Sequence, residues 1–242
     1  MNAIKHKIVI TGGSGRFGSI LKNNIKSKKI FFPKKKYLNI LSTNSIKKYL
    51  TKLKPKILIH LAGLSRPMNI HEKQICKSIE LNIIGTANIV KVCSELKIKL
   101  VYFSTNYVYP CKKGNYSEKS ALLPINNYAW SKLGGEASVQ MYKNSLILRA
   151  CMTEKPFLHK KAFANVKSNF IFHEDMAKIL FKLINQKGII NIGGETSTIY
   201  NFAKKKNSDV KKIFWNKKII NFPQNPSMSL NKLNKIISKK IK

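Results

Sequence analysis

The sequence predicts an α/β fold, a doubly wound parallel sheet with helices on both faces. One observation is a glycine-rich turn near the N-terminus, which joins a short apolar run to a helical pattern. The other is the alternation, over the first 150 residues, of apolar runs typical of buried strands with stripes typical of helices. Strands that alternate with helices form parallel sheets with right-handed crossovers. The length of 242 residues suits one such domain with an appended lobe.

The glycine-rich turn is Thr11-Gly12-Gly13-Ser14-Gly15-Arg16-Phe17-Gly18. Gly12 lets the chain reverse tightly, Gly15 lets the backbone approach a pyrophosphate, and Gly18 lets the following helix pack close to the strand. Backbone N–H groups at the start of that helix, together with its dipole, favour bound phosphates. Because the turn lies between a strand and a helix, it predicts a dinucleotide-binding site.

The first elements surround this turn. Residues 8–10 are an unbroken apolar run before it, and residues 16–26 carry a helical pattern after it. Residues 29–32 predict a short second strand, which Pro33 ends because proline cannot donate to a strand ladder. The segment 45–53 has a polar start followed by apolar residues at helical spacing, which predicts a second helix.

The pattern then repeats. Residues 57–63 are an apolar run that closes on small residues, and residues 100–105 are another run of strand length. We expect a long helix over 78–96 to connect these two buried strands. A helix over 128–142 and a strand over 145–148 follow. The sheet therefore has at least five expected strands, each separated from the next by a crossover.

A second group of residues, Thr105, Tyr128 and Lys132, is typical of acid–base chemistry. Thr105 ends an expected strand, as Gly12 and Gly63 do, and ligands of doubly wound sheets bind at the carboxyl ends of strands. A tyrosine and a lysine four residues apart on a helix face the same side. The ammonium favours the phenolate and can lower the tyrosine pKa by about 1–3 units. A hydroxyl from the strand end could bind the same substrate oxygen; the alternative is a surface Tyr–Lys pair.

The formal net charge of +36 raises the question of a nucleic-acid partner. Of the 46 basic residues, however, only Arg16, Arg66 and Arg149 are arginines, and the lysines are spread along the whole chain. Direct base readout favours the bidentate fork of arginine. We therefore expect no specific nucleic-acid binding, only weak and salt-sensitive association with polyanions.

The remaining composition predicts a cytoplasmic protein without membrane or metal. No apolar run approaches the ~20 residues of a membrane span, and the N-terminus leads almost directly into the first strand. The four cysteines are scattered, which is typical of reduced thiols. Neither the cysteines nor the histidines have the spacing of metal ligands.

Five segments together resemble one known family. In chain order they are Thr11–Gly18, Leu61-Ala62-Gly63, Asn82-Ile83-Ile84-Gly85-Thr86, Tyr102-Phe103-Ser104-Thr105-Asn106-Tyr107-Val108-Tyr109 and Asn127-Tyr128-Ala129-Trp130-Ser131-Lys132-Leu133-Gly134-Gly135-Glu136. The chain resembles the extended short-chain dehydrogenase/reductases of the NAD-dependent epimerase/dehydratase superfamily, in the dTDP-4-dehydrorhamnose reductase-like branch of nucleotide-sugar enzymes. Later segments resemble the part with which the family's chain returns to the sheet.

The resemblance implies a Rossmann NAD(P)-binding domain over 1–150 and, over 151–242, a small, shortened substrate lobe interleaved with the returning chain. It implies that Tyr128 is the acid/base, that Lys132 is its partner and a nicotinamide-ribose ligand, and that Thr105 orients the substrate. The cofactor-binding residues would be Gly12, Ser14, Gly15, Arg16, Phe17, Gly18, Lys34, Leu61, Ala62, Gly63, Tyr128 and Lys132. It also implies a homodimer through the helices 78–96 and 128–142.

Cofactor choice depends on the end of the second strand. NAD-specific members place an acidic residue there for the ribose hydroxyls. This chain has Phe31-Phe32-Pro33-Lys34-Lys35-Lys36 instead, and Arg16 projects from the glycine turn. Cationic side chains favour a 2′-phosphate, so the sequence favours NADP, with NAD as the alternative.

Three functions remain open. The first is a reductase that acts on a keto nucleotide-sugar. The second is epimerisation or 4,6-dehydration on the same fold; Asn106-Tyr107 stand where the dehydratases carry an acidic pair, which argues against dehydration. The third is a non-catalytic, NADP-binding regulatory subunit, which the shortened lobe favours and the intact Thr105, Tyr128 and Lys132 disfavour.

Overall fold

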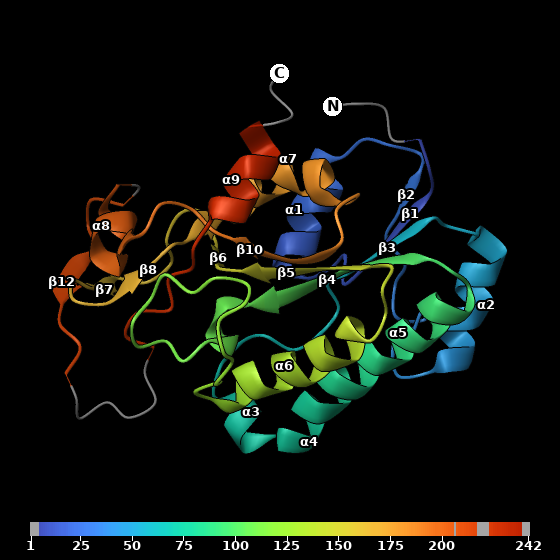
Figure 1. Cartoon of the computed structure of the whole chain (residues 1–242), viewed down its shortest axis with the longest axis horizontal. Helices are drawn as coiled ribbons and strands as arrows, with labels where there is room; N and C mark the ends of the chain where they lie inside the picture. The colour runs from blue at the N-terminus through green and yellow to red at the C-terminus, as the bar shows by residue number, and fades with distance from the viewer. Residues whose placement is uncertain (1–4, 206, 217–222, 239–242) are drawn as a thin grey trace. The chain divides into compact units, whose positions relative to one another are not determined.

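The computed structural model describes residues 5–205, 207–216 and 223–238 (Figure 1). Its central sheet has six strands in the order β10-β5-β4-β3-β1-β2. These strands are β1 (Ile8–Thr11), β2 (Ile30–Phe31), β3 (Ile57–His60), β4 (Lys99–Thr105), β5 (Ser145–Ala150) and β10 (Gly188–Ile192). The chain builds outward from β1 in one direction to β2 and in the other through β3, so the predicted doubly wound sheet is confirmed. The point where the order reverses lies between β1 and β3, which is where ligands bind in such folds.

The register brings the ends of β1 and β3 level with each other. The two strands are parallel, with Ile8 opposite Ile57 and Thr11 opposite His60. Every residue of both strands is buried. The glycine turn after Thr11 and the segment after His60 therefore leave the sheet side by side.

The chain divides into two compact units. The first comprises Met1–Ser104, Trp130–Ile147 and Gln186–Gly188. The second comprises Thr105–Ala129, Leu148–Asn185 and Ile189–Lys242. The glycine turn and Lys132 belong to the first unit, whereas Thr105 and Tyr128 belong to the second.

Helices of the first unit lie on both sides of its strands. The longer ones are α1 (Arg16–Asn24), α2 (Thr43–Leu53), α5 (Gly85–Glu95) and most of α6 (Asn127–Gln140), and the one-turn helix α3 (Ile70–Lys73) also belongs to this unit. Figure 1 shows α1 on one side of β1, β3 and β4, and α5 and α6 on the other. The helix α2 begins where the Ser42 hydroxyl accepts the N–H of Ser45 at 3.2 Å, a helix cap typical of serine.

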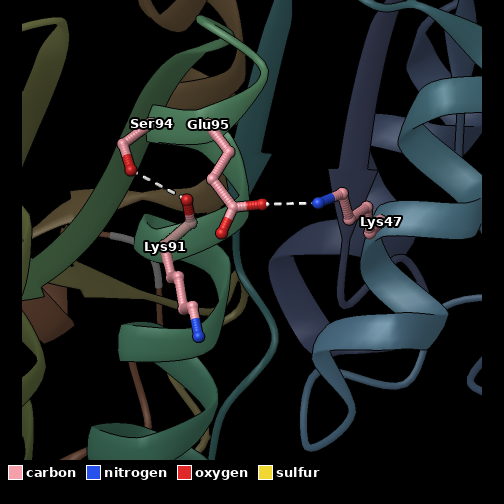
Figure 2. Close-up of polar contacts among 4 residues, drawn as sticks. All are labelled: Lys47, Lys91, Ser94 and Glu95. Carbon is pink, nitrogen blue, oxygen red and sulfur yellow. Dashed lines mark hydrogen bonds and ion pairs between the residues drawn. The ribbon is translucent and has the colours of Figure 1, made fainter.

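Polar contacts link α2 and its preceding loop to α5. Lys47 of α2 pairs with Glu95 of α5 at 2.9 Å across the gap seen in Figure 2. Asn88 of α5 donates to the Ile40 carbonyl at 3.0 Å. Since both partners of the ion pair are exposed, that pair contributes at most about 1 kcal/mol. The two helices are in contact and both bury apolar residues, among them Leu50 of α2 and Val92 of α5.

Two predicted elements differ in the structure. The helix expected over 78–96 consists of α4 (Ile75–Ser78), a π-helical segment (Ile79–Ile84) and α5. The wider π turn accommodates the buried side chain of Asn82, which bonds to a loop and to α6 rather than to solvent. The strand expected over 57–63 ends at His60, because the N–H groups of Leu61 and Ala62 donate to a side chain instead of a neighbouring strand.

The second unit contains short elements around its own core. In chain order they are a 3-10 turn (Asn106–Val108), β6 (Met152–Thr153), β7 (Lys161–Phe163), β8 (Lys167–Ser168), β9 (Ile171–Phe172), α7 (His173–Leu183), β11 (Ser197–Thr198), α8 (Ile199–Lys204), β12 (Lys211–Ile213) and α9 (Asn231–Ser238). Strands β6 and β9, and β7 and β12, pair in parallel, whereas β8 and β11 are antiparallel. A small apolar core includes Phe157, Ala162, Ala203 and Val210.

A buried polar network also holds the second unit together. Arg149, at 2% exposure, donates to the Tyr109 hydroxyl at 2.8 Å, and that hydroxyl donates to Asn191 at 2.8 Å. The Asn191 N–H donates to the Glu118 carboxylate at 3.0 Å. A buried charge is tolerated when its hydrogen bonds are satisfied. The role of Arg149 is therefore structural within this unit.

Over the described residues the structure has neither a membrane-spanning helix nor a candidate metal site. None of the helices there combines the length and the hydropathy that a bilayer crossing requires. In the same part of the chain, no three metal-ligating side chains gather into a candidate site. All four cysteines are free thiols, with Cys76 exposed and the other three buried.

Candidate cofactor site and catalytic residues

The glycine turn packs directly against the segment after β3. Gly12 has a positive φ of +72°, and a Cβ there would lie 2.6 Å from the Ala62 nitrogen. A Cβ on Gly18 would overlap the Gly12 carbonyl oxygen. These two positions therefore require glycine, one for its conformation and close approach and the other for helix packing. The sequence predicts glycine at these two positions for related reasons, a tight reversal of the chain at Gly12 and close packing of the helix at Gly18.

The start of α1 is bare backbone. Its N-cap is Gly15, which has no side chain to cap the helix, and the Gly15 N–H donates to the Gly12 carbonyl at 2.9 Å. Ser14, Gly15 and Arg16 are exposed, whereas Phe17 is buried, with its ring 5.4 Å from that of Phe103. A helix N-terminus exposed in this way suits a phosphate, because the N–H groups and the helix dipole point at the ligand. The residues present thus fit a dinucleotide.

A buried hydrogen-bond network positions the segment after β3. The Thr11 hydroxyl accepts the N–H groups of Leu61 and Ala62, each at 3.2 Å, so its own proton goes to His60 Nδ1 at 2.8 Å. That bond leaves His60 Nε2 protonated to donate to the Thr86 hydroxyl at 3.2 Å. Burial lowers the His60 pKa to about 3 and keeps the ring neutral. His60 is therefore a core histidine that orients the backbone beside Gly12.

Asn82 connects the loop after β3 to α6. Its side-chain oxygen accepts the Leu64 N–H at 2.7 Å, and its amide nitrogen lies 2.8 Å from both the Leu64 carbonyl and the Ser131 hydroxyl. A Cβ on Gly63 would lie 2.8 Å from the same side-chain oxygen. No role for Asn82 was predicted from the sequence. The available signal was that Asn82 is a polar residue at the start of the motif Asn82–Thr86, on an expected helix.

Lys132 lies among polar and aromatic groups of the first unit. Its ammonium is 4.2 Å from the ring centroid of Tyr102, a cation–π contact, and the Tyr102 hydroxyl donates to the Lys132 carbonyl at 3.0 Å. Burial lowers the Lys132 pKa to about 7, and the nearby Glu136 carboxylate opposes that shift. Near neutral pH the amine therefore exchanges between its charged and neutral forms.

The other two predicted catalytic residues lie in the second unit. Thr105 is buried at the end of β4, and its hydroxyl accepts the Tyr107 N–H at 3.3 Å. Tyr128 is half-buried near the start of α6, where Asn126 accepts the Ala129 N–H at 2.9 Å. Tyr128 and Lys132 are four residues apart on α6, so the helix gives both side chains the same general direction.

The end of β2 carries no carboxylate. Phe32 packs on the glycine turn, since a Cβ on Gly13 would lie 2.9 Å from its ring. The three lysines that follow Pro33, Lys34 among them, are exposed. Arg16 donates to the Ser65 hydroxyl at 2.9 Å, which fixes the guanidinium beside the loop after β3. Cationic side chains thus lie in the glycine turn and directly after β2.

Comparisons with known proteins agree with this arrangement. Residues 6–164 match the family of the RmlD substrate binding domain. The chain is 30% identical over 142 residues to methionine adenosyltransferase 2 subunit beta of Xenopus tropicalis, an alignment that covers 55% of this chain and 42% of the Xenopus protein. It therefore spans less than half the length of that relative.

Two solved structures share the fold over nearly the whole chain. The dTDP-4-dehydrorhamnose reductase of Bacillus anthracis, in complex with NADP, has a TM-score of 0.84 at 23% identity, with 97% of this chain and 92% of that chain covered. WbmG of Bordetella bronchiseptica, in complex with NAD and UDP, has a TM-score of 0.76 at 17% identity, with 96% and 89% covered.

Proposed function

Because this chain belongs to the family of the RmlD substrate binding domain, we propose that it is an NAD(P)H-dependent reductase of a keto nucleotide-sugar, similar to dTDP-4-dehydrorhamnose reductase. One observation carries the proposal. The unit that holds the exposed glycine turn also holds Lys132 over the Tyr102 ring, on the same helix as Tyr128. A phosphate-binding turn and a titrating lysine four residues from a tyrosine are the parts that carbonyl reduction needs.

The cofactor would be NADP, with NAD as the alternative. Its phosphates would be held by the glycine turn, which includes Gly15 at the start of α1. Its nicotinamide ribose would be held by Lys132. The segment Leu61–Gly63, oriented by Thr11, would line the site. When bound, the reduced cofactor supplies a hydride. The relatives whose structures contain NADP or NAD support this choice.

The protein's own residues would manage the proton and the developing charge. Reduction of a ketone places negative charge on its oxygen in the transition state, so a proton donor and a fixed hydrogen bond accelerate the step. Tyr128 would donate the proton, Lys132 would keep the phenol poised to do so, and Thr105 would hold the substrate oxygen. The nucleotide part of this substrate class is supported by the UDP bound to WbmG.

Turnover assays distinguish the candidate chemistries. The protein is incubated with NADPH and a panel of dTDP- and UDP-linked keto sugars, and absorbance and product are followed. A reductase consumes NADPH in proportion to product. An epimerase, tested in parallel with the oxidised cofactor and the corresponding hydroxy sugars, isomerises the sugar with no net change in the cofactor, because the hydride that the cofactor takes from the sugar is returned to it. Isomerisation without consumption would therefore reject the reductase in favour of the epimerase.

A regulatory subunit is the second candidate. The matched Xenopus protein is named as a subunit of another enzyme, and this chain spans 42% of its length. Such a protein would bind NADPH and turn over no sugar in the same panel. NADPH binding without turnover, in protein confirmed to be folded, would place this function ahead of the reductase.

We expect NADPH to bind about tenfold more tightly than NADH, because one charge-assisted contact to the 2′-phosphate is worth about 1.5 kcal/mol. The motivating residues are Lys34 and Arg16, with no acidic residue at the end of β2. Titration of nucleotide fluorescence measures both constants. Lys34→Ala should bring the NADPH and NADH affinities closer together, whereas Lys52→Ala on α2 should leave their ratio unchanged. Equal affinities for the two nucleotides would contradict this prediction.

We also propose a homodimer through α5 and α6. On the α5 side, Ile79 is 40% exposed, Ser94 is exposed, and Ile83 packs over Gly134 of α6. The Ser94 hydroxyl donates to the Lys91 carbonyl of its own helix at 2.8 Å (Figure 2), so covering it leaves no donor unsatisfied. The face toward the sheet is instead made by buried residues such as Ile89.

Light scattering at micromolar concentration tests the dimer. We expect twice the chain mass for the parent protein and a shift toward one chain mass for Ile79→Glu, since a charge is costly inside an apolar interface. Phe214→Glu is the matched control, because Phe214 is also a large exposed apolar residue but belongs to the second unit. A stable monomer of the parent protein would refute the proposal.

A further inference from the structure

We propose that Glu136 is a positioning residue that holds the Lys132 amine in place and in its charged form, an inference that rests on the proposed function. Glu136 is completely buried, at 0% exposure, and lies four residues after Lys132 on α6. Side chains at this spacing lie next to each other on one face of a helix. No role for Glu136 was predicted from the sequence, although it ends the motif Asn127–Glu136.

The carboxylate of Glu136 is fixed from two directions. One oxygen accepts the Ser104 hydroxyl of β4 at 2.5 Å, and the other accepts the amide of Gln140 at 3.2 Å. A buried carboxylate is costly unless hydrogen bonds and a nearby cation offset the loss of hydration. The two hydrogen bonds keep the Glu136 carboxylate in one position, and the nearby cation is Lys132, one helical turn away. The bond to Ser104 also ties α6 to β4 directly before Thr105.

Three groups of the first unit face the Lys132 amine. The Tyr102 ring of β4 lies 4.2 Å away, and Glu136 acts from the same helix. The ring of His60 of β3 stacks on that of Tyr102 at 6.0 Å between centroids, and it is neutral because burial lowers its pKa to about 3. Glu136 is thus the anion that counters burial, which otherwise lowers the Lys132 pKa. Small changes in this balance matter, since that pKa is about 7.

The direction of the effect follows from the charges. An anion beside an amine stabilises its protonated form and raises its pKa. Removing the anion lowers that pKa, so the ammonium is lost at a lower pH. Any step that needs the ammonium then declines at a lower pH. In the proposed function these steps are the binding of the cofactor ribose and the poising of Tyr128.

Glu136→Gln tests the inference, because it removes the charge while keeping the size and one acceptor. NADPH affinity is measured by fluorescence at each pH from 6 to 9, for the parent and the variant. NADPH affinity should decline as the pH rises, and we expect the midpoint of this decline to lie about 1 pH unit or more lower in the variant than in the parent. Ser138→Ala, on the same helix, should leave the profile unchanged. In a Lys132→Arg background, Glu136→Gln should shift nothing, since arginine stays charged throughout.

Several results would overturn the proposal. They are an unchanged profile in folded Glu136→Gln, a shift that persists in the Lys132→Arg background, and a parent affinity that does not vary with pH. If Glu136→Gln does not fold, Glu136→Asp is the deciding variant, because it moves the charge away from Lys132 by one methylene. A smaller downward shift of the pH at which NADPH affinity declines supports the proposal, and no shift rejects it. The readout needs no sugar, so a parent that binds NADPH without turnover would count against the reductase and not against Glu136.

Discussion

Tyr128→Phe is expected to lower turnover of the keto nucleotide-sugar by about 10²–10⁴, the typical contribution of general acid catalysis. The substitution removes the phenolic hydroxyl and keeps the ring, so packing at the start of α6 is retained. NADPH affinity should stay nearly unchanged, because the glycine turn and Lys132 belong to the first unit and are not altered. Absorbance of NADPH gives the turnover, and nucleotide fluorescence gives the affinity.

The matched control is Tyr200→Phe, which makes the same chemical change on α8 of the second unit. The Tyr200 hydroxyl accepts a hydrogen bond from Lys204 at 3.1 Å, an exposed contact, so its loss should leave turnover within about twofold of the parent. Full activity in Tyr128→Phe would show that another group protonates the substrate. An equal loss in both variants would point to damage of the fold instead.

The parts of the fold that depend on local sequence were predictable. The glycine turn can be recognised from the sequence because the contacts that require Gly18 are made within a few residues. The close approach of Ala62 to Gly12 is the exception, since it joins distant parts of the chain. The strands β1, β3 and β4 are buried on both faces and appear as continuous apolar runs. From these runs the parallel, doubly wound arrangement follows by connection rules alone.

The contacts that position the site were not predictable, because they join residues far apart in the sequence. Asn82 and Ser131 are separated by 49 positions, as are Thr11 and His60. The Ser104–Glu136 bond spans 32 positions. No periodicity marks such a pair, since each member looks like an ordinary polar residue on a strand or helix. The π turn at residues 79–84 was also missed; it contains the buried Asn82, whose partners are likewise distant in the sequence.

Gly18→Ala should cause the largest loss among substitutions in the cofactor site. A Cβ at this position would overlap the Gly12 carbonyl and lie 2.9 Å from the Gly13 Cα, and both are backbone atoms that cannot rotate away. The turn or the whole of α1 must therefore shift. Overpacking of this kind costs about 1–3 kcal/mol, which for a chain of this size lowers the melting temperature by about 2–4 °C per kcal/mol. Because the displaced turn is the proposed phosphate site, NADPH affinity should fall at least about tenfold.

Gly85→Ala separates this effect from the general cost of adding a methyl group to a buried helical glycine. Gly85 begins α5, and a Cβ there would meet the end of the Ile40 side chain at 2.8 Å, an atom that can move by rotation, while the nearest backbone atom, the Glu80 carbonyl oxygen, is 3.3 Å away. Alanine is also favoured over glycine in helices by about 1 kcal/mol. Stability and NADPH affinity of Gly85→Ala should therefore stay close to those of the parent. If the melting temperature and the NADPH affinity of Gly18→Ala equal those of Gly85→Ala, the close packing of α1 on the turn does not determine the shape of the cofactor site.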